Sequence, residues 1–345
     1  MTSLNLAVIG AGRIGRLHAE NIATRLNGVR LSGVADINLL AAREVASRFH
    51  VSLATDNYRS LLANPTIGAV AICSATNTHA EIILEAAAAG KHIFCEKPID
   101  YDQARIGRCL EAVAKAGVKL QIGFNRRFDP SFAKVRELVA AGKIGQPHVV
   151  RITSRDPAPP PLEYVKVSGG LFLDMTIHDF DMVRFLSASE AEEIYALGDA
   201  LVDPQVAGVG DVDTAIVTMR LKNGALAAID NSRQAIYGYD QRVEVFGSGG
   251  MVSVSNRTPD NHILADASGL HTARPQYFFL ERYQESYVAE MQAFVDCVLQ
   301  DRPPPVTGED GLAPVLMGLA ATKSLKERRP VKLSEVASSS PSAPL

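Results

Sequence analysis

The sequence predicts a two-domain protein: an α/β domain with a doubly wound parallel sheet, followed by an α+β domain with a large, mostly antiparallel open sheet. The first third of the chain alternates short apolar runs with helical patterns, whereas longer strands of alternating polarity follow after about residue 123. At 345 residues the chain is also too long for one ordinary core. We expect the first domain at 1–123, the second at 124–330 and a tail at 331–345, with its Ser- and Pro-rich end disordered.

The strands expected in the first domain are short and apolar. The continuous apolar run at 69–73 is typical of a strand that is covered on both faces. Asn38 is a typical N-cap residue, and Gly90 is placed to end a helix. The expected elements are, in order, strand 6–9, helix 14–26, strand 29–35, helix 38–49, strand 69–73, helix 79–89, strand 92–95, a further helix, and strand 118–122.

The second domain has a different pattern. Residues 214–221 alternate, which directs Ala215, Val217, Met219 and Leu221 to one face of a strand. Asn223-Gly224 predicts a hairpin turn into a strand at 225–229, and 242–246 predicts another strand. A final amphipathic helix at 281–300 is indicated by apolar side chains at helical spacing, namely Tyr287, Met291, Phe294, Val295 and Val298.

Composition excludes several classes of function. The net charge of −3 gives no broad positive field to hold nucleic acid or an anionic membrane. No apolar run approaches the ~18 residues of a membrane span, and the N-terminus lacks the basic start of a signal peptide. The four cysteines show no metal-ligand spacing, so we expect reduced cysteines, no bound metal and a cytoplasmic location.

A glycine fingerprint opens the first predicted helix. Gly10-Ala-Gly-Arg13-Ile14-Gly15 fits G-x-G-x-x-G and follows a strand directly, which is the context that makes this short motif informative. Gly10 permits the tight turn, Gly12 lets the backbone approach a pyrophosphate, and Gly15 lets helix and strand lie close together. The pyrophosphate would lie at the helix N-terminus, where free N–H groups favour negative charge.

Asp36 ends the next strand, 21 residues after Gly15. A carboxylate there accepts hydrogen bonds from the adenosine ribose and repels a 2′-phosphate, and Ile37-Asn38 follow in place of an arginine. The cofactor is therefore expected to be NAD, not NADP. Two alternatives remain at this point: a glycine turn and a solvated Asp36 without any ligand, or FAD, which uses the same fingerprint.

Two short motifs carry the expected chemistry. Glu96-Lys97-Pro98 follows a strand, so Lys97 lies at the carboxyl edge of the sheet and can donate to a substrate hydroxyl. Asp174 and His178 are four residues apart and would share one helix face, where the histidine can accept a hydroxyl proton as hydride leaves. Taken alone, the first motif could be a surface lysine and the second a structural pair or an incomplete metal site, with no third ligand evident.

Further polar segments suit a ligand that carries many hydroxyl groups. These are 123–129 (Gly-Phe-Asn-Arg-Arg-Phe-Asp), 154–156 (Ser-Arg-Asp) and 237–240 (Tyr-Gly-Tyr-Asp). Ring hydroxyls need fixed donors and acceptors, whereas apolar walls contribute little to their recognition.

The order of these motifs resembles the Gfo/Idh/MocA oxidoreductase family over residues 4–330. Within that family, the segments starting at Gly123, Ser154 and Gly169 are similar to those of bacterial inositol 2-dehydrogenases. The resemblance implies a Rossmann domain followed by a domain with a large open sheet. It also implies NAD-dependent oxidation of myo-inositol, or a close isomer, to the keto-inositol.

The resemblance further implies roles for individual residues. His178 would be the general base, with Asp174 and Lys97 steering it, and Pro98 would follow a cis peptide. Glu96, Ser74, Thr76, Asn77 and His79 would lie at the cofactor. Substrate-facing positions would be Asn125, Arg126, Asp156 and Tyr237, in addition to the catalytic residues.

Alternatives within and outside this class stay open. The substrate could be another polyol or pyranose, such as scyllo- or chiro-inositol or glucose. A sugar-sensing regulator on the same fold is the rival from another class, although a sensor need not retain Lys97, Asp174 and His178. We also expect a homotetramer with sheets facing each other, because Thr214, Ile216 and Thr218 would point to the uncovered face.

Overall fold

The computed structural model describes residues 3–337, and the end of the predicted tail, 338–345, lies outside the described residues. The chain divides into two compact units. The first contains residues up to Phe128 together with 285–313, and the second contains 129–284 together with the segment that starts at Pro314. The expected domains at 1–123 and 124–330 differ from these units, because they placed residues 285–313 in the second domain.

A parallel sheet of six strands forms the centre of the first unit, within the described residues. The strand order is β3-β2-β1-β4-β5-β6, and every neighbouring pair is parallel. The direction of strand order reverses between β1 and β4, and ligands of such sheets bind outside the carboxyl ends at that point. The strands are β1 Leu4–Ile9, β2 Val29–Ala35, β3 Ala54–Thr55, β4 Ala69–Ile72, β5 His92–Glu96 and β6 Leu120–Gly123.

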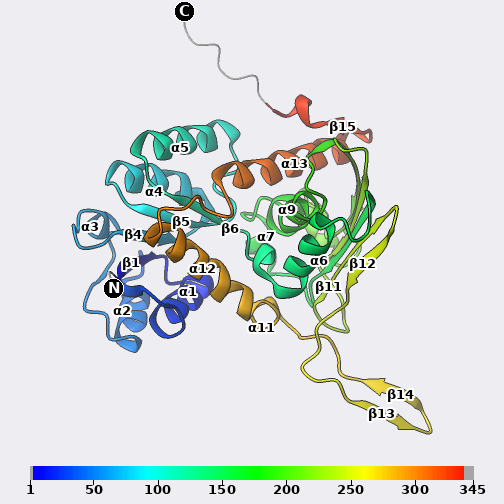
Figure 1. The fold of residues 1–345 in the computed structure, drawn as a ribbon, viewed down its shortest axis with the longest axis horizontal. Coiled ribbons are helices and arrows are strands. Elements are labelled where there is room, and N and C mark those ends of the chain that lie inside the picture. The colour runs from blue at the N-terminus through cyan, green and yellow to red at the C-terminus, as the bar shows by residue number, and fades with distance from the viewer. Residues whose placement is uncertain (1–2, 338–345) are drawn as a thin grey trace, which may run out of the picture. The chain divides into compact units, whose positions relative to one another are not determined.

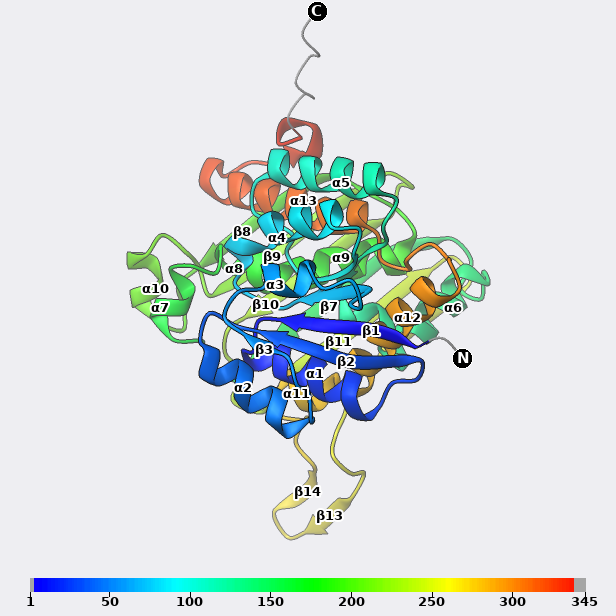
Figure 2. The same ribbon diagram turned by 90° about the vertical axis from the view of Figure 1, so that its left-hand side faces the viewer.

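Helices cover both faces of this sheet. Figure 2 shows α4 and α5 on one side and α1 and α2 on the other. The predicted N-cap is confirmed, since the side chain of Asn38 accepts a hydrogen bond from the Leu40 N–H at 3.1 Å. The two-residue strand β3 and the short helix α3 had not been predicted. The helices are α1 Arg13–Thr24, α2 Leu39–Arg48, α3 Arg59–Leu62, α4 Thr76–Ala88, α5 Gln103–Ala116, and the 3-10 helix η1 Asn125–Phe128.

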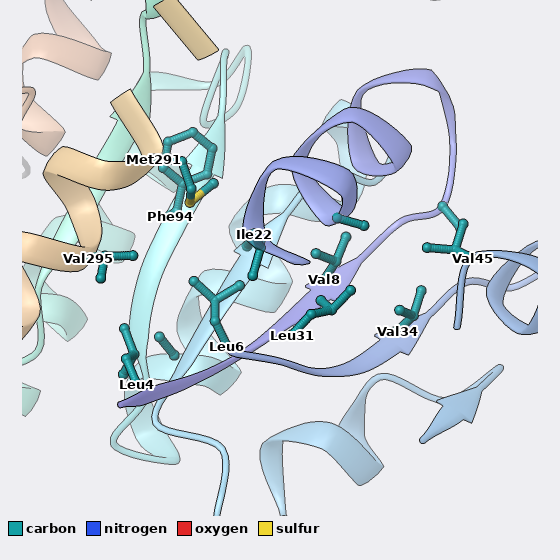
Figure 3. Packing of buried hydrophobic residues seen from close by; sticks show 14 of the residues in the cluster. Leu4, Leu6, Val8, Ile22, Leu31, Val34, Val45, Phe94, Met291 and Val295 are labelled. Carbon is teal, nitrogen blue, oxygen red and sulfur yellow. The ribbon is translucent and has the colours of Figure 1, made fainter. Parts of the chain in front are cut away.

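Helix α12 (Gln284–Leu299) belongs to the first unit although it follows most of the second in sequence. Its buried residues Met291 and Val295 join the cluster that contains Leu6 and Ile22, and Figure 3 shows these side chains together. The prediction of a helix with these apolar residues is confirmed. One continuous helix over 281–300 is wrong, because Tyr283 separates α12 from the short helix α11, Phe279–Arg282.

The second unit is built on a mixed sheet of seven strands, again within the described residues. Its order is β12-β11-β7-β10-β9-β8-β15, and only β7 and β10 are a parallel pair. The predicted turn at Asn223-Gly224 joins β9 to β10, with Gly224 at φ +86°. The strands are β7 Pro147–Arg155, β8 Ala191–Asp199, β9 Thr214–Leu221, β10 Leu226–Ser232, β11 Asp240–Gly247, β12 Gly250–Val254 and β15 Val331–Lys332.

Helices cover one face of this sheet, as Figure 1 shows for α6 and α9. The predicted alternation in β9 is confirmed: Ala215, Val217 and Met219 are buried, whereas Ile216 is 48% exposed on the other face. A separate hairpin of β13 (Ile263–Asp266) and β14 (Gly269–Thr272) projects from this unit (Figure 1). The remaining helices are α6 Pro130–Ala140, α7 Leu162–Val165, α8 Leu171–Asp174, α9 Thr176–Ser187, α10 Pro204–Gly208, α13 Gly308–Glu327 and the 3-10 helix η2 Leu333–Glu335.

No helix between residues 3 and 337 combines the length and the apolar character that crossing a membrane requires.

Candidate active site

The glycine fingerprint forms the turn between β1 and α1. Gly10 has φ +101°, and a Cβ there would lie 2.5 Å from the main-chain oxygen of Cys73. A Cβ at Gly15 would lie 1.8 Å from the main-chain oxygen of Gly10, so the helix can start this close to the strand only with glycine. Gly12 is exposed, and a Cβ there would meet no heavy atom of the described residues within 4 Å.

Gly12 is also the N-cap of α1, and Arg13 and Ile14 begin the helix. The first N–H groups of a helix have no partner within the helix, and the helix dipole adds positive potential at that end. The open space at Gly12 therefore adjoins backbone donors that suit a pyrophosphate.

Asp36 lies beside this loop at the end of β2. Its Oδ2 accepts a hydrogen bond from the Ala11 N–H at 2.6 Å, and its Oδ1 accepts one from the Asn38 N–H at 2.8 Å. The side chain remains partly exposed. One carboxylate therefore fixes the glycine loop and presents negative charge where the sequence predicted the ribose.

His79 is within hydrogen-bonding distance of main-chain oxygens in both the segment after β4 and the segment after β5. Its ring is buried, with Nδ1 2.8 Å from the Pro98 oxygen and Nε2 3.0 Å from the Ser74 oxygen. Burial lowers the pKa of His79, although these carbonyl contacts partly oppose the shift. His79 therefore acts as a positioning residue, while Thr76 and Asn77 at the start of α4 are more accessible.

Glu96 is the last residue of β5 and Lys97 follows it, and both are partly exposed. Glu96 Oε1 lies 2.7 Å from Nε2 of His18, a buried residue of α1. The Lys97–Pro98 peptide is cis, as the family resemblance implied. Asn125 and Arg126 follow β6 in η1 and are buried in the first unit.

The Gly169-Gly170 pair shapes the approach to α8 in the second unit. Both glycines have positive φ, +85° and +83°. A Cβ at Gly170 would lie 2.9 Å from an oxygen of Asp211, whose two oxygens accept hydrogen bonds from the Leu171 N–H at 3.0 and 3.1 Å. Asp211 thus holds the N-terminus of α8.

Asp174 and His178 do not lie on one continuous helix, so that part of the prediction is wrong. Asp174 is the last residue of α8, and α9 begins at Thr176 after Met175. Met175 lies between the two helices as the C-cap of α8 and the N-cap of α9, and the His178 N–H bonds to its main-chain oxygen, three residues back, at 3.3 Å. His178 lies in the first turn of α9 and is partly exposed.

Arg233 holds Asp174 in place. Its Nη2 donates to Asp174 Oδ2 at 2.8 Å, and its Nη1 lies 3.5 Å from Asp156 Oδ2. Tyr164 donates from its hydroxyl to the other Asp174 oxygen at 2.8 Å. Burial lowers the pKa of Arg233, but Asp174 and Asp156 raise it by more, so the guanidinium stays charged. Sequence reasoning missed Arg233 and Tyr164, since neither belongs to a recognisable motif.

Replacing Arg233 by lysine is expected to reduce the free energy of unfolding by about 1.5–3 kcal/mol, because lysine cannot keep both carboxylate contacts of the planar guanidinium. Urea denaturation measures this change. Arg48→Lys is the control, since Arg48 forms an exposed ion pair with Glu20 and its replacement should have an effect of at most about 0.5 kcal/mol. Equal losses in both variants would show that Arg233 contributes no more than a surface charge.

A buried polar network fixes the first turn of α9 to the sheet. Thr176 donates to Asn231 Oδ1 at 2.6 Å, and Asn231 Nδ2 donates to Asp179 Oδ2 at 2.8 Å. Asn231 also donates to the main-chain oxygen of Ser154. These contacts surround the position of His178 in sequence and orient the turn that carries it.

The hydroxyl of Tyr237 belongs to a different set of polar contacts from that around Asp174. It donates to Asp240 at 2.6 Å and accepts from Arg155 at 3.0 Å, and Arg155 in turn pairs with Asp230. Asp230 lies opposite Ile216 in the strand register and therefore on the uncovered face of the sheet. Asn231, the next residue, points to the face that carries α9.

The geometry defines a class of protein: an oxidoreductase with a Rossmann domain for a dinucleotide and a second domain that presents fixed acidic, basic and imidazole groups. Residues 4–124 match the oxidoreductase family with the NAD-binding Rossmann fold, and 132–253 match the Gfo/Idh/MocA C-terminal domain. The chain belongs to the Gfo/Idh/MocA family and is an NAD-dependent dehydrogenase. The alternatives of FAD and of a non-catalytic sensor are not supported.

Similar proteins cover nearly the whole chain. The myo-inositol 2-dehydrogenase of Thermotoga maritima is 50% identical over 96% of this chain and 99% of its own length. A crystal structure described as a putative myo-inositol dehydrogenase from Sinorhizobium meliloti has a TM-score of 0.93 and 41% identity, and covers 96% of this chain and all of its own. The scyllo-inositol dehydrogenase of Lactobacillus casei, crystallised with NAD(H) and scyllo-inositol, has a TM-score of 0.91 and 30% identity at the same coverage.

Proposed function

We propose that this protein oxidises myo-inositol, or a close isomer, to the keto-inositol with reduction of NAD. The observation that carries the proposal is the group around Asp174, where Arg233 and Tyr164 orient one carboxylate next to the turn that carries His178. Fixed donors and acceptors of this kind suit a ring that carries a hydroxyl on every carbon. The near full-length similarity to a myo-inositol 2-dehydrogenase supports the same substrate class.

NAD, when bound, supplies the hydride acceptor. We assign its pyrophosphate to the open space at Gly12 and its adenosine ribose to Asp36, because this loop offers backbone donors and a carboxylate beside them. Ser74, Thr76 and Asn77 follow β4, and Glu96 is the last residue of β5. All four lie at the carboxyl edge of the sheet, and we assign them to the nicotinamide half.

In this proposal His178 accepts the proton of the reacting hydroxyl. Asp174 accepts hydrogen bonds from ring hydroxyls, and Lys97 donates to the reacting oxygen and favours its ionised form. Lys97 lies in the first unit and the other two residues lie in the second. Asn125, Arg126 and Asp156 are assigned to the remaining ring hydroxyls.

The test is NADH formation over a panel of substrates: myo-, scyllo- and chiro-inositol, and glucose. The proposal expects the highest kcat/KM with myo-inositol. Preference for scyllo-inositol would correct the isomer, and preference for glucose with no activity on any inositol would overturn the proposal.

Asp36→Ser is expected to weaken NAD and to improve relative use of NADP about tenfold or more, because the repulsion between a carboxylate and a 2′-phosphate is removed. The ratio of kcat/KM for the two cofactors measures this. A wild-type enzyme that already prefers NADP would contradict the ribose assignment.

We also propose that four chains assemble through the uncovered sheet face. Apolar side chains on that face are about half exposed, namely Leu197, Ile216, Leu226, Phe246 and Met251. The strand register places Leu197 beside Ile216, and Leu226, Phe246 and Met251 around Val149, with Arg151 and Glu244 on the same face between the two groups. Exposed apolar groups of this kind favour association. Light scattering is expected to give about 148 kDa, four times 37.0 kDa.

Ile216→Asp tests this assembly, because it replaces an apolar side chain of the uncovered face by a carboxylate opposite Asp230. We expect the variant to dissociate, whereas Leu201→Asp, an exposed position outside the sheet, should leave the mass unchanged. A wild-type mass of one chain would rule out the proposed assembly.

A further inference from the structure

A buried group of two carboxylates and one imidazole lies in the first unit, and of its members only Glu96 was assigned a role above, at the nicotinamide half of NAD. It consists of His18 on α1, Glu96 at the end of β5 and Glu290 on α12. One nitrogen or oxygen from each lies within 4.8 Å of the others. His18 and Glu290 have no exposed surface, and the side chain of Glu96 is 12% exposed.

Glu290 is the unusual member of this group. Both of its carboxylate oxygens are buried, and neither has a hydrogen-bond donor among residues 3–337. An ionised carboxylate without any donor is too costly to bury, and two carboxylates this close cannot both ionise. Burial raises the pKa of Glu290 well above its ordinary value, and the charge of Glu96 raises it further.

Within residues 3–337, the causes that shift the pKa of Glu290 are its burial and the charge of Glu96, and no cation is among them. His18 faces the group from α1, Cys73 from the segment after β4, and Tyr287 lies one turn earlier on α12, with its ring 5.8 Å from that of His18. Burial raises the pKa of the Cys73 thiol, and the charge of Glu96 raises it further, so Cys73 is neutral. Gln121 on β6 donates to the main-chain oxygen of Glu290 at 2.8 Å, so this hydrogen bond does not involve the carboxyl group.

If Glu290 is protonated, its O–H needs an acceptor, and the carboxylate of Glu96 is the acceptor in this group. An ionised Glu96 can only accept, so Nε2 of His18 carries the proton of their 2.7 Å hydrogen bond. A protonated Glu290 supplies a second donor on the other side. One carboxylate then lies between two donors, and no buried charge is left without a partner.

A divalent cation is a poorer explanation of the same residues. Zinc ligands lie about 2.0–2.2 Å from the metal, which keeps neighbouring ligands roughly 3.3 Å apart in a tetrahedral site. The 2.7 Å contact between His18 and Glu96 is shorter than this and is the length of a charge-assisted hydrogen bond.

We propose that Glu290 is a neutral carboxylic acid that donates its proton to Glu96, and that this pair, completed by His18, positions the end of β5 that carries Lys97. Glu290 and His18 are positioning residues, because they act on Lys97 through Glu96. The effect on catalysis rests on the proposed role of Lys97, whereas the protonation state of Glu290 does not.

The protonation state is tested by infrared spectroscopy of the full-length protein. At neutral pH the wild type should show the C=O band of a protonated carboxylic acid that is lost in Glu290→Gln. The exposed Glu111→Gln is the control and should keep the band. No difference between wild type and Glu290→Gln would overturn the proposal, as would a stoichiometric divalent metal in the purified wild-type protein.

The pH dependence of unfolding gives a second readout. A carboxyl group whose pKa is raised by folding contributes stability that is fully present below its unfolded pKa and is lost as the pH rises through its folded pKa. Between pH 5 and 8 the Tm of the wild type should therefore fall relative to that of Glu290→Gln. A parallel course of the two curves would contradict the proposal.

The positioning role is tested by comparing two substitutions. Glu290→Gln keeps a neutral donor and should keep NAD affinity and kcat within about threefold. Glu290→Ala removes the donor and should weaken NAD affinity or kcat roughly tenfold or more. Equal losses in both variants would overturn the positioning role. If Glu290→Ala does not fold, a roughly tenfold loss of NAD affinity or kcat in Glu290→Gln would by itself overturn the positioning role.

Discussion

Replacing His178 by glutamine is expected to lower kcat by about 10²–10⁴-fold, the usual contribution of a general base. NAD affinity should stay near the wild-type value, because the glycine loop and Asp36 lie in the other unit. Glutamine fills a similar volume, and the buried network of Thr176, Asn231 and Asp179 would still hold the turn. The loss should therefore appear in turnover and not in folding.

Three measurements on one variant separate catalysis from structure: kcat, the Kd for NAD, and Tm. The wild-type rate should rise with pH, since only a neutral imidazole can accept the hydroxyl proton, and the variant should lose this dependence. His262→Gln, an exposed histidine of the second unit, is the control and should leave all three unchanged. Normal turnover of the folded variant, with a lower Tm, would assign His178 to the structure and not to catalysis.

Two alanine substitutions in the glycine fingerprint are expected to impair different properties, NAD affinity at Gly12 and stability at Gly15. Gly12→Ala should fold normally, because its Cβ meets no described atom within 4 Å and its φ of −71° is ordinary for alanine. The added methyl group would occupy the space that we assign to the pyrophosphate. We expect the Kd for NAD to rise about a hundredfold, which corresponds to roughly 2.7 kcal/mol.

Gly15→Ala should instead lose stability. Its Cβ would lie 1.8 Å from a main-chain oxygen, and no side-chain rotation relieves a clash with the backbone. We expect a loss of about 3 kcal/mol or more, at the upper end for overpacking. Chemical denaturation and NAD titration of both variants check the contrast. Two variants with the same stability and the same affinity would contradict the separate roles of Gly12 and Gly15.

The first unit was largely predictable because its signals are local. The glycine spacing has to match a strand, a tight turn and a helix within a few residues, and the structure shows why Gly10 and Gly15 cannot carry a side chain. The apolar run at β4 and the N-cap Asn38 are likewise explained by their own backbone positions. Asp36 could be assigned because its distance along the chain from the fingerprint follows from one strand and one helix.

The acid group around Asp174 was only partly predictable. Asp174 and His178 belong to one motif, but Arg233 follows them by more than fifty residues and reaches Asp174 only because β10 lies beside the other strands. The contacts of Tyr237 could not be predicted either, because the direction of a side chain after a strand depends on the turn that follows. Its hydroxyl is hydrogen-bonded to Arg155 and Asp240, and its place at the substrate stays a prediction.

The sequence by itself determined the order of strands and helices in most of the first unit, the nucleotide loop and the hairpin of β9 and β10, because periodicity and glycine positions act over a few residues. It also predicted the residues that would carry the chemistry. Only the tertiary structure decided which sheet receives α12. The apolar face of α12 could pack on either core. In the structure it packs with Leu6 and Ile22, and this places Glu290 beside His18 and Glu96. Contacts between residues so far apart leave no trace in local patterns, because folding selects them by the total apolar surface that they bury.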